Sequence, residues 1–593
     1  MCANKKIIVY QVFTRLFGNT KTLNKPWGTI AENGVGKFAD FTNKALSSIK
    51  ELGVTHIWYT GVLHHALVGE YAHQGISYDH PEIVKGRAGS PYAIKDYYNV
   101  NPDLAVDVKH RLEEFEELIT RSHQHGLKVV IDIVPNHVAR KYQSISKPKG
   151  VKDFGEDDDV SKQYEVNNNF YYNPAEFFST PRWEEGYQPL GGEPYPYQVG
   201  DYIENPARWT GNGSRNSQPG YYDWYETAKL NFGVAPDGNK DFDELPDDYQ
   251  FKNHQTHVEF WQNRNIPDTW LKFRDIVYYW LDKGVDGFRY DMAELVPVEF
   301  WSFLNSAIKV KKPTSFLLAE VYEPNLYRPY LGLGKMDYLY DKVSLYDNLK
   351  DLIKGQGCAD YLIGIQDYKS DIEHQMLHFL ENHDEHRVAS ADFAANAQKA
   401  FPAMVVSAMV STSPIMLYFG QEVGEPALER AGFGSPGRTS IFDYIGVPHH
   451  QRWMNHGKFD GGQSTVTEKN TRDFYQRLLK FTANSSAVMG NYQEIHNHNK
   501  AHCPNYNDRL FSFVRWCEDE KLIVIVNFQA TDAYDLELKL PSDLLCEWGL
   551  EDQVYKIEDQ LYKQKYHLTV KQGIGCVSIK IAALESLILR VFI

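Results

Sequence analysis

The hydrophobic pattern of the first 137 residues repeats a simple unit: an apolar run, a helical stripe, a glycine and another apolar run. The apolar, β-branched runs predict buried strands, and a glycine after a helical stripe is typical of a helix C-terminus. Such a repeat favours parallel strands joined by crossover helices, with both faces of the sheet covered. The expected strands are Lys6–Phe13, Val54–Tyr59 and Lys128–Val134, and the expected helices are Phe41–Leu52 and Asp107–His125.

The same pattern resumes after residue 254 and brings the expected strands to eight. Eight alternating units predict an α/β fold of the (β/α)₈ TIM barrel type. The expected strands here are Asp286–Asp291, Ser315–Glu320, a weak one near Met336–Tyr340, Met376–Glu381 and Pro414–Phe419. The expected helices are Trp270–Lys283, Pro297–Lys309, Asp392–Ser411 and a closing helix near Asn470–Phe481.

Two stretches depart from this pattern. Residues 138–254 have no clean period, and because so long a loop does not stay structureless in a compact protein, we expect an inserted subdomain after the third strand. From about Val488 apolar and polar residues alternate, which predicts a C-terminal antiparallel β-sandwich without helices. The expected domains are therefore the barrel (1–137 with 255–487), the insert (138–254) and the sandwich (488–593).

Composition excludes several classes of function. The net charge is −16, from 62 Lys and Arg against 78 Asp and Glu, and a nucleic-acid partner would need a basic surface. The chain has no run of 18 apolar residues, so no transmembrane segment is predicted. The spacing of the six cysteines is typical neither of a disulfide scaffold nor of a zinc site. Nothing indicates an organic cofactor, and the oligomeric state stays open. Aromatic residues make up 14% of the chain. They are expected either to belong to the core or to provide stacking surfaces for a ligand.

The N-terminus leaves two locations open. It has no hydrophobic segment typical of a signal peptide, which favours a cytoplasmic protein. Cys2 lies very close to the first strand, and a lipidated cysteine at that position is the alternative, in a processed periplasmic or surface lipoprotein.

Polar residues gather where four of the expected strands end. These ends contain Asp132 to His137, Arg289 to Asp291, Glu320, and Glu381 to Asp384. Singly, each has an ordinary explanation as a helix cap or an ion pair. Jointly they predict a catalytic rim, because the C-terminal ends of barrel strands converge on one site.

Converging carboxyl groups favour glycoside hydrolysis, in which one carboxylate is the nucleophile and a second carboxyl group protonates the leaving oxygen. Arg289 and Asp291 share one face of their strand, so we expect the cation to lower the pKa of Asp291. Glu320 has no neighbouring cation in the sequence and is expected to be the group held protonated.

These motifs resemble those of the α-amylase family of retaining α-glucan enzymes, glycoside hydrolase family 13. The resemblance runs in order from Ile7 to about Glu425 and loosely through the tail. The stretches that carry it are Asp132–His137, Gly287–Asp291, Leu318–Glu320 and Asn382–Asp384.

The resemblance implies roles for individual residues. Asp291 would form the covalent intermediate, Glu320 would act as general acid and then base, and Asp384 would bind ring hydroxyls and favour a distorted sugar. The implied substrate-binding residues are Tyr92, which would stack on the sugar or merely pack, together with Asp132, His137, Arg289 (which would orient Asp291) and His383.

The resemblance also leaves a metal open. Asn136 matches an asparagine that binds a structural calcium ion in the family, and Ca²⁺ prefers such oxygen ligands. Many relatives carry Lys and then His three and four residues after the nucleophile, where this chain has Glu294 and Leu295. The grip on the leaving-side sugar and the calcium site are therefore both in question, and a calcium-free protein is the equal alternative.

The expected activity is hydrolysis of α-1,4-glucosidic bonds in starch-type glucans or maltooligosaccharides. An α-glucan transglycosylase like the 4-α-glucanotransferases is the alternative within the family. A non-catalytic relative acting as a binding module is the alternative of another class, but it predicts the loss of an acid, and all three are present. Chain length and endo or exo action stay open.

Overall fold

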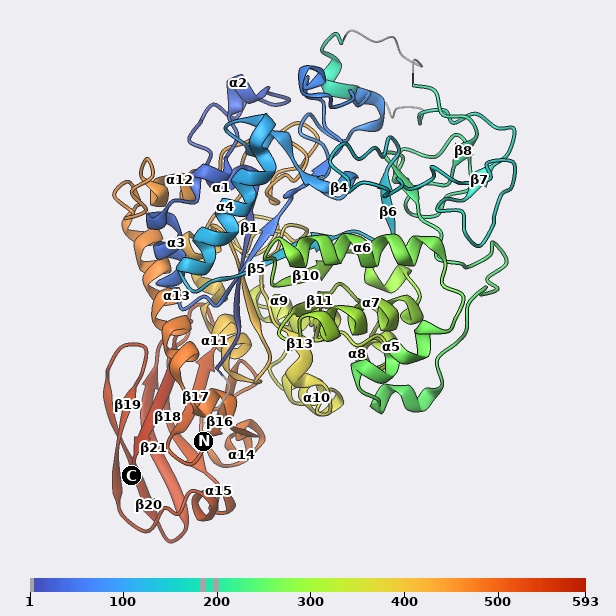
Figure 1. Cartoon of the computed structure of the whole chain (residues 1–593). Helices are drawn as coiled ribbons and strands as arrows, with labels where there is room; N and C mark the ends of the chain where they lie inside the picture. Colours follow the sequence, from blue (N-terminus) through green and yellow to red (C-terminus); the bar gives the residue numbers. More distant parts are fainter. Residues whose placement is uncertain (1–4, 182–187, 196–201) are drawn as a thin grey trace.

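A parallel β-barrel forms the centre of the chain (Figure 1). The computed structural model describes residues 5–181, 188–195 and 202–593. The barrel strands are β1 (Ile8–Phe13), β2 (His56–Thr60), β5 (Lys128–Ile133), β10 (Gly287–Tyr290), β11 (Phe316–Ala319), β12 (Tyr338–Tyr340), β13 (Met376–Leu377) and β14 (Ile415–Tyr418). They pair in parallel in chain order, with β14 beside β1, and a bridge between His378 and Ile415 closes the ring. The expected (β/α)₈ barrel is confirmed.

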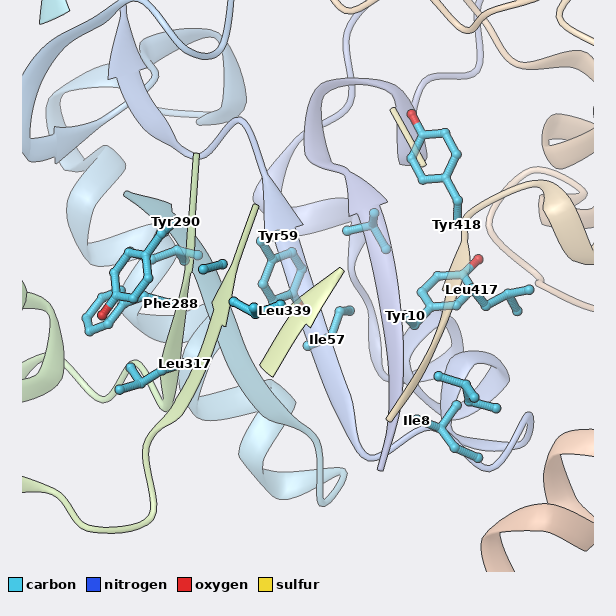
Figure 2. Packing of buried hydrophobic residues seen from close by; sticks show 14 of the residues in the cluster. Ile8, Tyr10, Ile57, Tyr59, Phe288, Tyr290, Leu317, Leu339, Leu417 and Tyr418 are labelled. Carbon is cyan, nitrogen blue, oxygen red and sulfur yellow. The ribbon is translucent and has the colours of Figure 1, made fainter. Parts of the chain in front are cut away.

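Alternation along the strands separates two apolar layers. Residues such as Val9, Trp58 and Leu318 form a core of their own inside the ring. Their neighbours in sequence, including Tyr10, Ile57 and Leu317, belong to the larger core beneath the helices (Figure 2). This is why the strands are apolar on both faces.

Helices surround the barrel. They are α1 (Thr14–Phe17), α2 (Ile30–Asn33), α3 (Asn43–Lys50), α4 (Arg111–Gln124), α5 (His254–Gln262), α6 (Asp268–Asp282), α7 (Val298–Lys311), α8 (Tyr327–Gly332), α9 (Asp347–Ile353), α10 (Tyr361–Tyr368), α11 (Phe401–Met409), α12 (Pro448–Met454) and α13 (Val466–Asn484). The closing helix α13 begins at a capping box, in which Thr465 and Glu468 each accept a hydrogen bond from the other's backbone.

Two predicted elements are shorter than expected. The strand predicted over Met376–Glu381 ends at Leu377, and Glu381 lies beyond it, where it accepts hydrogen bonds from the Arg387 guanidinium and the Val388 amide. The helix predicted over Asp392–Ser411 is reduced to α11, which has Pro402 in its first turn, where the missing amide proton of proline costs no helical hydrogen bond.

The described residues of the expected insert form short strands and short 3₁₀ helices. β6 (His137–Ala139) pairs with β9 (Thr227–Lys229), and β7 (Tyr172–Asn173) pairs with β8 (Ala207–Arg208), both antiparallel. Before the insert, β3 (Leu63–His65) and β4 (Ile94–Val100) form a hairpin. The Leu230 amide donates to the Asn136 carbonyl at 3.1 Å, so the insert returns directly onto the end of the third barrel strand. The domain boundaries stay a prediction.

The C-terminal strands form one antiparallel sheet around a second core. The strands are β15 (Asn491–Glu494), β16 (Leu510–Trp516), β17 (Lys521–Asn527), β18 (Tyr534–Leu540), β19 (Val554–Asp559), β20 (Lys565–Lys571), β21 (Ile574–Ile581) and β22 (Ser586–Phe592). The expectation that this region lacks helices is wrong, because α14 (His496–His502) and α15 (Ser542–Glu547) lie between strands. Phe513 and Val524 face the barrel side and join its outer core.

Within the described ranges, no helix is both long enough and apolar enough to cross a bilayer. Cys2, on which the lipoprotein alternative depends, lies outside the described residues.

Candidate active site

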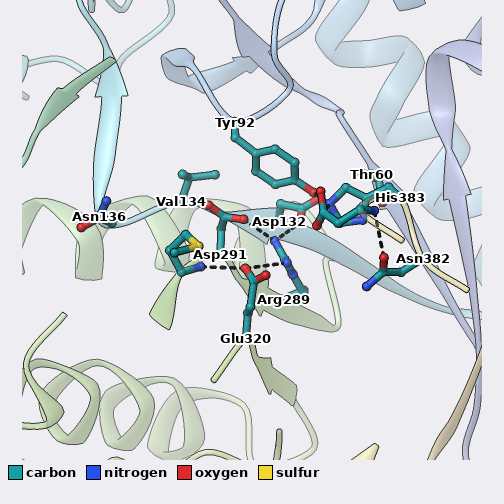
Figure 3. A network of polar contacts seen from close by, with 12 residues as sticks. Thr60, Tyr92, Asp132, Val134, Asn136, Arg289, Asp291, Glu320, Asn382 and His383 are labelled. Carbon is teal, nitrogen blue, oxygen red and sulfur yellow. Dashed lines mark hydrogen bonds and ion pairs between the residues drawn. The ribbon is translucent and has the colours of Figure 1, made fainter. Parts of the chain in front are cut away.

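The Arg289 guanidinium lies at the centre of the rim (Figure 3). Phe288 and Tyr290 point outward into the helix-covered core, so Arg289 and Asp291 share the inward direction. Arg289 is fully buried, and its Nη1 donates to Asp291 Oδ1 at 2.7 Å. The pairing predicted from the sequence is therefore present.

The same guanidinium also holds Glu320, at the end of the next strand. Arg289 Nη2 donates to Glu320 Oε2 at 2.8 Å, and the Met292 amide donates to that oxygen at 2.9 Å. Met292 adopts a left-handed backbone conformation, with φ of 46°, of the kind that clusters at functional sites. The expectation that Glu320 has no adjacent cation is wrong, because its cation comes from the neighbouring strand.

Asp132 completes the surroundings of the guanidinium. Its Oδ1 lies 3.5 Å from Arg289 Nη1, and its Oδ2 accepts a hydrogen bond of 2.9 Å from Trp58 Nε1. On another side, Arg289 Nε donates to the Tyr340 hydroxyl at 3.3 Å. Burial raises the pKa of Asp132 to about 6, although Arg289 acts to lower it. Asp132 and Tyr340 thus fix the position of Arg289.

His383 forms a second group with Asp384 and Tyr92. Gln11 Nε2 lies 2.8 Å from His383 Nδ1, and because an amide nitrogen only donates, Nδ1 accepts and Nε2 carries the proton. Nε2 lies 3.1 Å from Asp384 Oδ2 and also contacts the Tyr92 hydroxyl. The Tyr92 and His383 rings stack with centroids 5.2 Å apart.

His137 is oriented by the residue before it. Asn136 Nδ2 donates to His137 Nδ1 at 3.0 Å and to the Gly211 carbonyl at 2.8 Å. His137 Nε2 is then the nitrogen that carries the proton. The imidazole also lies edge-on to Trp224 of the insert, with ring centroids 5.2 Å apart.

A cavity of about 400 Å³ opens over these groups. Five of the predicted site residues line it: Tyr92, His137, Asp291, Glu320 and Asp384. Arg289, Asp132 and Asn136 are not among its described lining residues. His383 instead lines an adjoining cavity of about 490 Å³, which shares Asp384 and Arg438 with the first.

Several residues at the site were not predicted from the sequence. Lys85, Trp224, Glu226, Tyr322 and Arg438 line the cavity. Lys85 Nζ and Glu226 Oε1 lie 2.9 Å apart and join a barrel loop to the insert across the cavity wall. Gln11, which contacts His383, could have been recognised in the sequence as a polar residue inside an apolar strand. No local feature of the sequence marks Lys85 or Glu226 as site residues.

Glu294, one of the two departures from the family pattern, acts on the cavity indirectly. Its Oε2 accepts hydrogen bonds from the Tyr322 amide at 2.8 Å and from the Glu323 amide at 3.0 Å. It therefore fixes the loop that places Tyr322 in the wall. Leu295, the other departure from the family pattern, is 44% exposed.

Burial acts on the pKa values of two carboxyl groups in this cluster. Burial raises the pKa of Asp291 well above its usual value, although Arg289 lowers it. Burial and the nearby Glu320 carboxylate raise the pKa of Asp384 to about 7. The expected lowering by Arg289 is present, but the pKa of Asp291 is raised on balance, because one guanidinium does not offset burial together with the neighbouring Glu320 and Asp384 carboxylates.

The residues around Asn136 do not fit a calcium ion. Ca²⁺ takes six to eight oxygen ligands, whereas the Asn136 Oδ1 atom accepts a hydrogen bond from Lys229 Nζ. Burial lowers the pKa of Lys229 to about 8. Among the described residues, no three His, Cys, Asp or Glu side chains form a group suited to a metal.

Comparison with known proteins identifies a single family. The family model described as "Alpha amylase, catalytic domain" matches residues 11–473. Alpha-amylase 3 of Dictyoglomus thermophilum is 23% identical over 438 residues, which is 71% of this chain and 64% of that protein. A cyclomaltodextrin glucanotransferase of Niallia circulans is 22% identical over 432 residues, 70% of this chain and 48% of that protein. The chain thus spans less than two thirds of either relative.

A solved structure supports the fold. The noncanonic maltogenic alpha-amylase of Thermotoga neapolitana superposes with a TM-score of 0.59 at 17% identity, covering 100% of both chains.

The two aspartates that flank β10 provide a test of the electrostatics. Because the pKa of Asp291 is raised in the folded protein, its folded state loses stability as the pH rises above the unfolded value of about 4. Asp291→Asn removes that loss, so we expect it to be more stable than wild type at pH 8. The gain should vanish near pH 4, as measured by thermal unfolding across the pH range.

Asp286, just before β10, is the matched control with the opposite sign. Burial raises its pKa, but hydrogen bonds from His123, the Val129 amide and Lys312 together bring the pKa below its usual value. Asp286→Asn should therefore destabilise the protein at pH 8, with a deficit that shrinks as the pH falls below 4. Equal shifts in both variants would contradict this assignment.

Proposed function

The chain belongs to the α-amylase family of glycosidases, and from that premise we propose a retaining hydrolase of α-1,4-glucosidic bonds in starch-type glucans or maltooligosaccharides. The observation that carries the proposal is the shared guanidinium: Arg289 binds Asp291 and Glu320 at once. Both carboxyl groups line one cavity. Carboxyl groups held this close favour the retaining spacing of roughly 5–5.5 Å over the inverting spacing of roughly 6.5–9.5 Å.

In the first step, the Asp291 carboxylate attacks the anomeric carbon. The bond from that carbon to the glycosidic oxygen breaks, and Glu320 gives its proton to the departing oxygen. The products of this step are a glycosyl ester of Asp291, an ionised Glu320 and a shortened glucan.

In the second step, Glu320 takes a proton from a water molecule as the water oxygen attacks the anomeric carbon. The ester bond breaks, the sugar leaves with its original α-configuration, and Asp291 and Glu320 return to their starting states. The two inversions together retain the configuration.

The shared guanidinium also suits this sequence. The reactive form needs an ionised Asp291 and a protonated Glu320, and it has the same total charge as a form with the proton on Asp291. Because Arg289 binds both carboxyl groups, moving the proton between them leaves the charge near the guanidinium unchanged.

The remaining groups bind the sugar that reacts. Tyr92 offers an apolar face for stacking, and His137 Nε2 and Asp384 offer a donor and an acceptor to ring hydroxyls. His383 contacts both Asp384 and the Tyr92 hydroxyl, so we assign it to positioning these two groups. Arg289 and Asp132 position the nucleophile.

Transfer to a second glucan is the alternative, supported by the cyclomaltodextrin glucanotransferase among the relatives. It shares the first step and differs only in whether water or a sugar hydroxyl attacks the ester. The adjoining cavity that shares Asp384 and Arg438 provides further space for a sugar chain. The non-catalytic alternative is disfavoured, because all three acids line the cavity.

Product analysis tests the stereochemistry. Wild-type enzyme and a reducing-end-labelled maltooligosaccharide, followed by proton NMR from the first seconds, should give new reducing ends as the α-anomer before mutarotation. An initial β-anomer would refute retention. Labelled products longer than the substrate would show that transfer, and not hydrolysis, is the main reaction.

Two variants with different substrates separate the roles of the acids. Glu320→Gln should lower turnover of maltooligosaccharides by roughly 10²–10⁴-fold. It should still release a rapid burst of fluoride from α-maltosyl fluoride, because fluoride leaves without a proton. Asp291→Asn should lose the burst as well, since it has no nucleophile.

The comparison needs folded proteins, so the thermal unfolding of both variants is the control. If Glu320→Gln lost the fluoride burst to the same extent as Asp291→Asn, the general-acid assignment would be wrong.

A further inference from the structure

A lysine of the insert contacts the residue predicted to bind calcium. Lys229 is the last residue of β9 and lies opposite His137 in the ladder with β6. Its Nζ donates to Oδ1 of the fully buried Asn136. Lys229 is also held through its backbone, because its amide donates to the Trp209 carbonyl at 3.0 Å.

The ammonium determines how the Asn136 amide group is turned. A lysine only donates hydrogen bonds, so the amide oxygen must face it and the amide nitrogen must face the other way. That nitrogen then meets two acceptors, His137 Nδ1 at 3.0 Å and the Gly211 carbonyl at 2.8 Å. One cation thereby orders the end of the third barrel strand, the returning strand of the insert and the loop at Gly211.

Among residues 5–181, 188–195 and 202–593, no Asp or Glu forms an ion pair with the Lys229 ammonium, and no group of three or more His, Cys, Asp or Glu side chains could hold a metal ion. An ammonium needs only hydrogen-bond acceptors, whereas Ca²⁺ needs a shell of oxygens that usually includes carboxylates. The oxygen and the buried location suit a single internal monocation.

We propose that the Lys229 ammonium takes the structural place of a calcium ion, so that a cation of the chain itself fastens the insert to the barrel. The protein is then independent of Ca²⁺ for its folding stability. Because Asn136 also orients His137, which lines the catalytic cavity, the same contact sets the protonated nitrogen of an imidazole at the site. The proposal does not depend on the linkage that the enzyme cleaves.

The first experiment uses the wild-type protein without any activity readout. The midpoint of thermal unfolding is measured after exhaustive dialysis against EGTA and again with millimolar CaCl₂, and bound calcium is measured by atomic emission. We expect identical midpoints and substoichiometric calcium. A midpoint raised by CaCl₂, or one equivalent of calcium retained through EGTA, would overturn the proposal.

The second experiment removes the cation. Lys229→Met keeps an unbranched side chain that is one heavy atom shorter and leaves Asn136 Oδ1 without its donor, and an unsatisfied buried acceptor is destabilising. We expect a lower midpoint that CaCl₂ does not restore. Lys141→Met is the matched control in the same insert, because Lys141 is exposed and, within the described part of the chain, donates to the Tyr78 carbonyl rather than to a buried side chain, and its midpoint should equal that of wild type.

The third variant exchanges the cation for a ligand. Lys229→Asp places a carboxylate beside Asn136 Oδ1, so we expect a protein that is destabilised in EGTA and whose midpoint rises on addition of CaCl₂. A midpoint unaffected by CaCl₂ would count against the equivalence of the two cations. If Lys229→Met unfolded at the wild-type temperature, the structural role of the ammonium would be refuted, and the wild-type measurement stays decisive if a variant fails to fold.

Discussion

The buried guanidinium of Arg289 is the interaction on which the catalytic rim depends. Moving a cation out of water costs several kcal/mol, and only close partners with good geometry offset that cost. Here Asp132, Asp291 and Glu320 supply them from three adjacent strands. The parallel register provides the alignment, because Arg289 lies directly beside Asp132 on β5 and Leu318 on β11. The carboxylates need the guanidinium in turn, since burial alone would neutralise them.

The two ends of β10 show how one strand separates stability from chemistry. At its start, Asp286 accepts hydrogen bonds from His123, Lys312 and a backbone amide, and this set of contacts favours the ionised form. At its end, Asp291 shares one cation with other acids, and this arrangement leaves it less stable when ionised. Barrels place catalytic residues at the C-terminal ends of their strands and stabilising contacts at the other ends. A carboxylate whose ionised form is disfavoured in the resting protein loses its charge when it forms a bond to carbon, and this favours formation of the ester.

The sequence was most informative where a property is local. Apolar runs with glycine stops located the barrel strands, and strand-end polarity located Asp291, Glu320 and Asp384. It was least informative where partners are distant in the chain. Gln11 and His383 are 372 residues apart, and Glu320 seemed to lack a cation because Arg289 reaches it only across the pairing of β10 with β11. The end of β13 was misjudged for a different reason, since Glu381 reads as part of an apolar strand but binds Arg387, only six residues further along the chain.

The prediction of calcium at Asn136 shows what a motif leaves out, because the sequence pointed to the asparagine but not to the residues that surround it in the fold. An asparagine oxygen accepts equally well from a metal or from an ammonium, so the side chain alone does not distinguish them. The distinction lies in Lys229, 93 residues away, which reaches Asn136 only because β9 pairs back onto β6. A divalent ion would make the insert depend on the surrounding solution, whereas an ammonium in the chain makes its attachment a property of folding. The orientation of His137 then follows from the same hydrogen bonds that attach the insert. The insert and the His137 imidazole in the cavity wall are therefore ordered together.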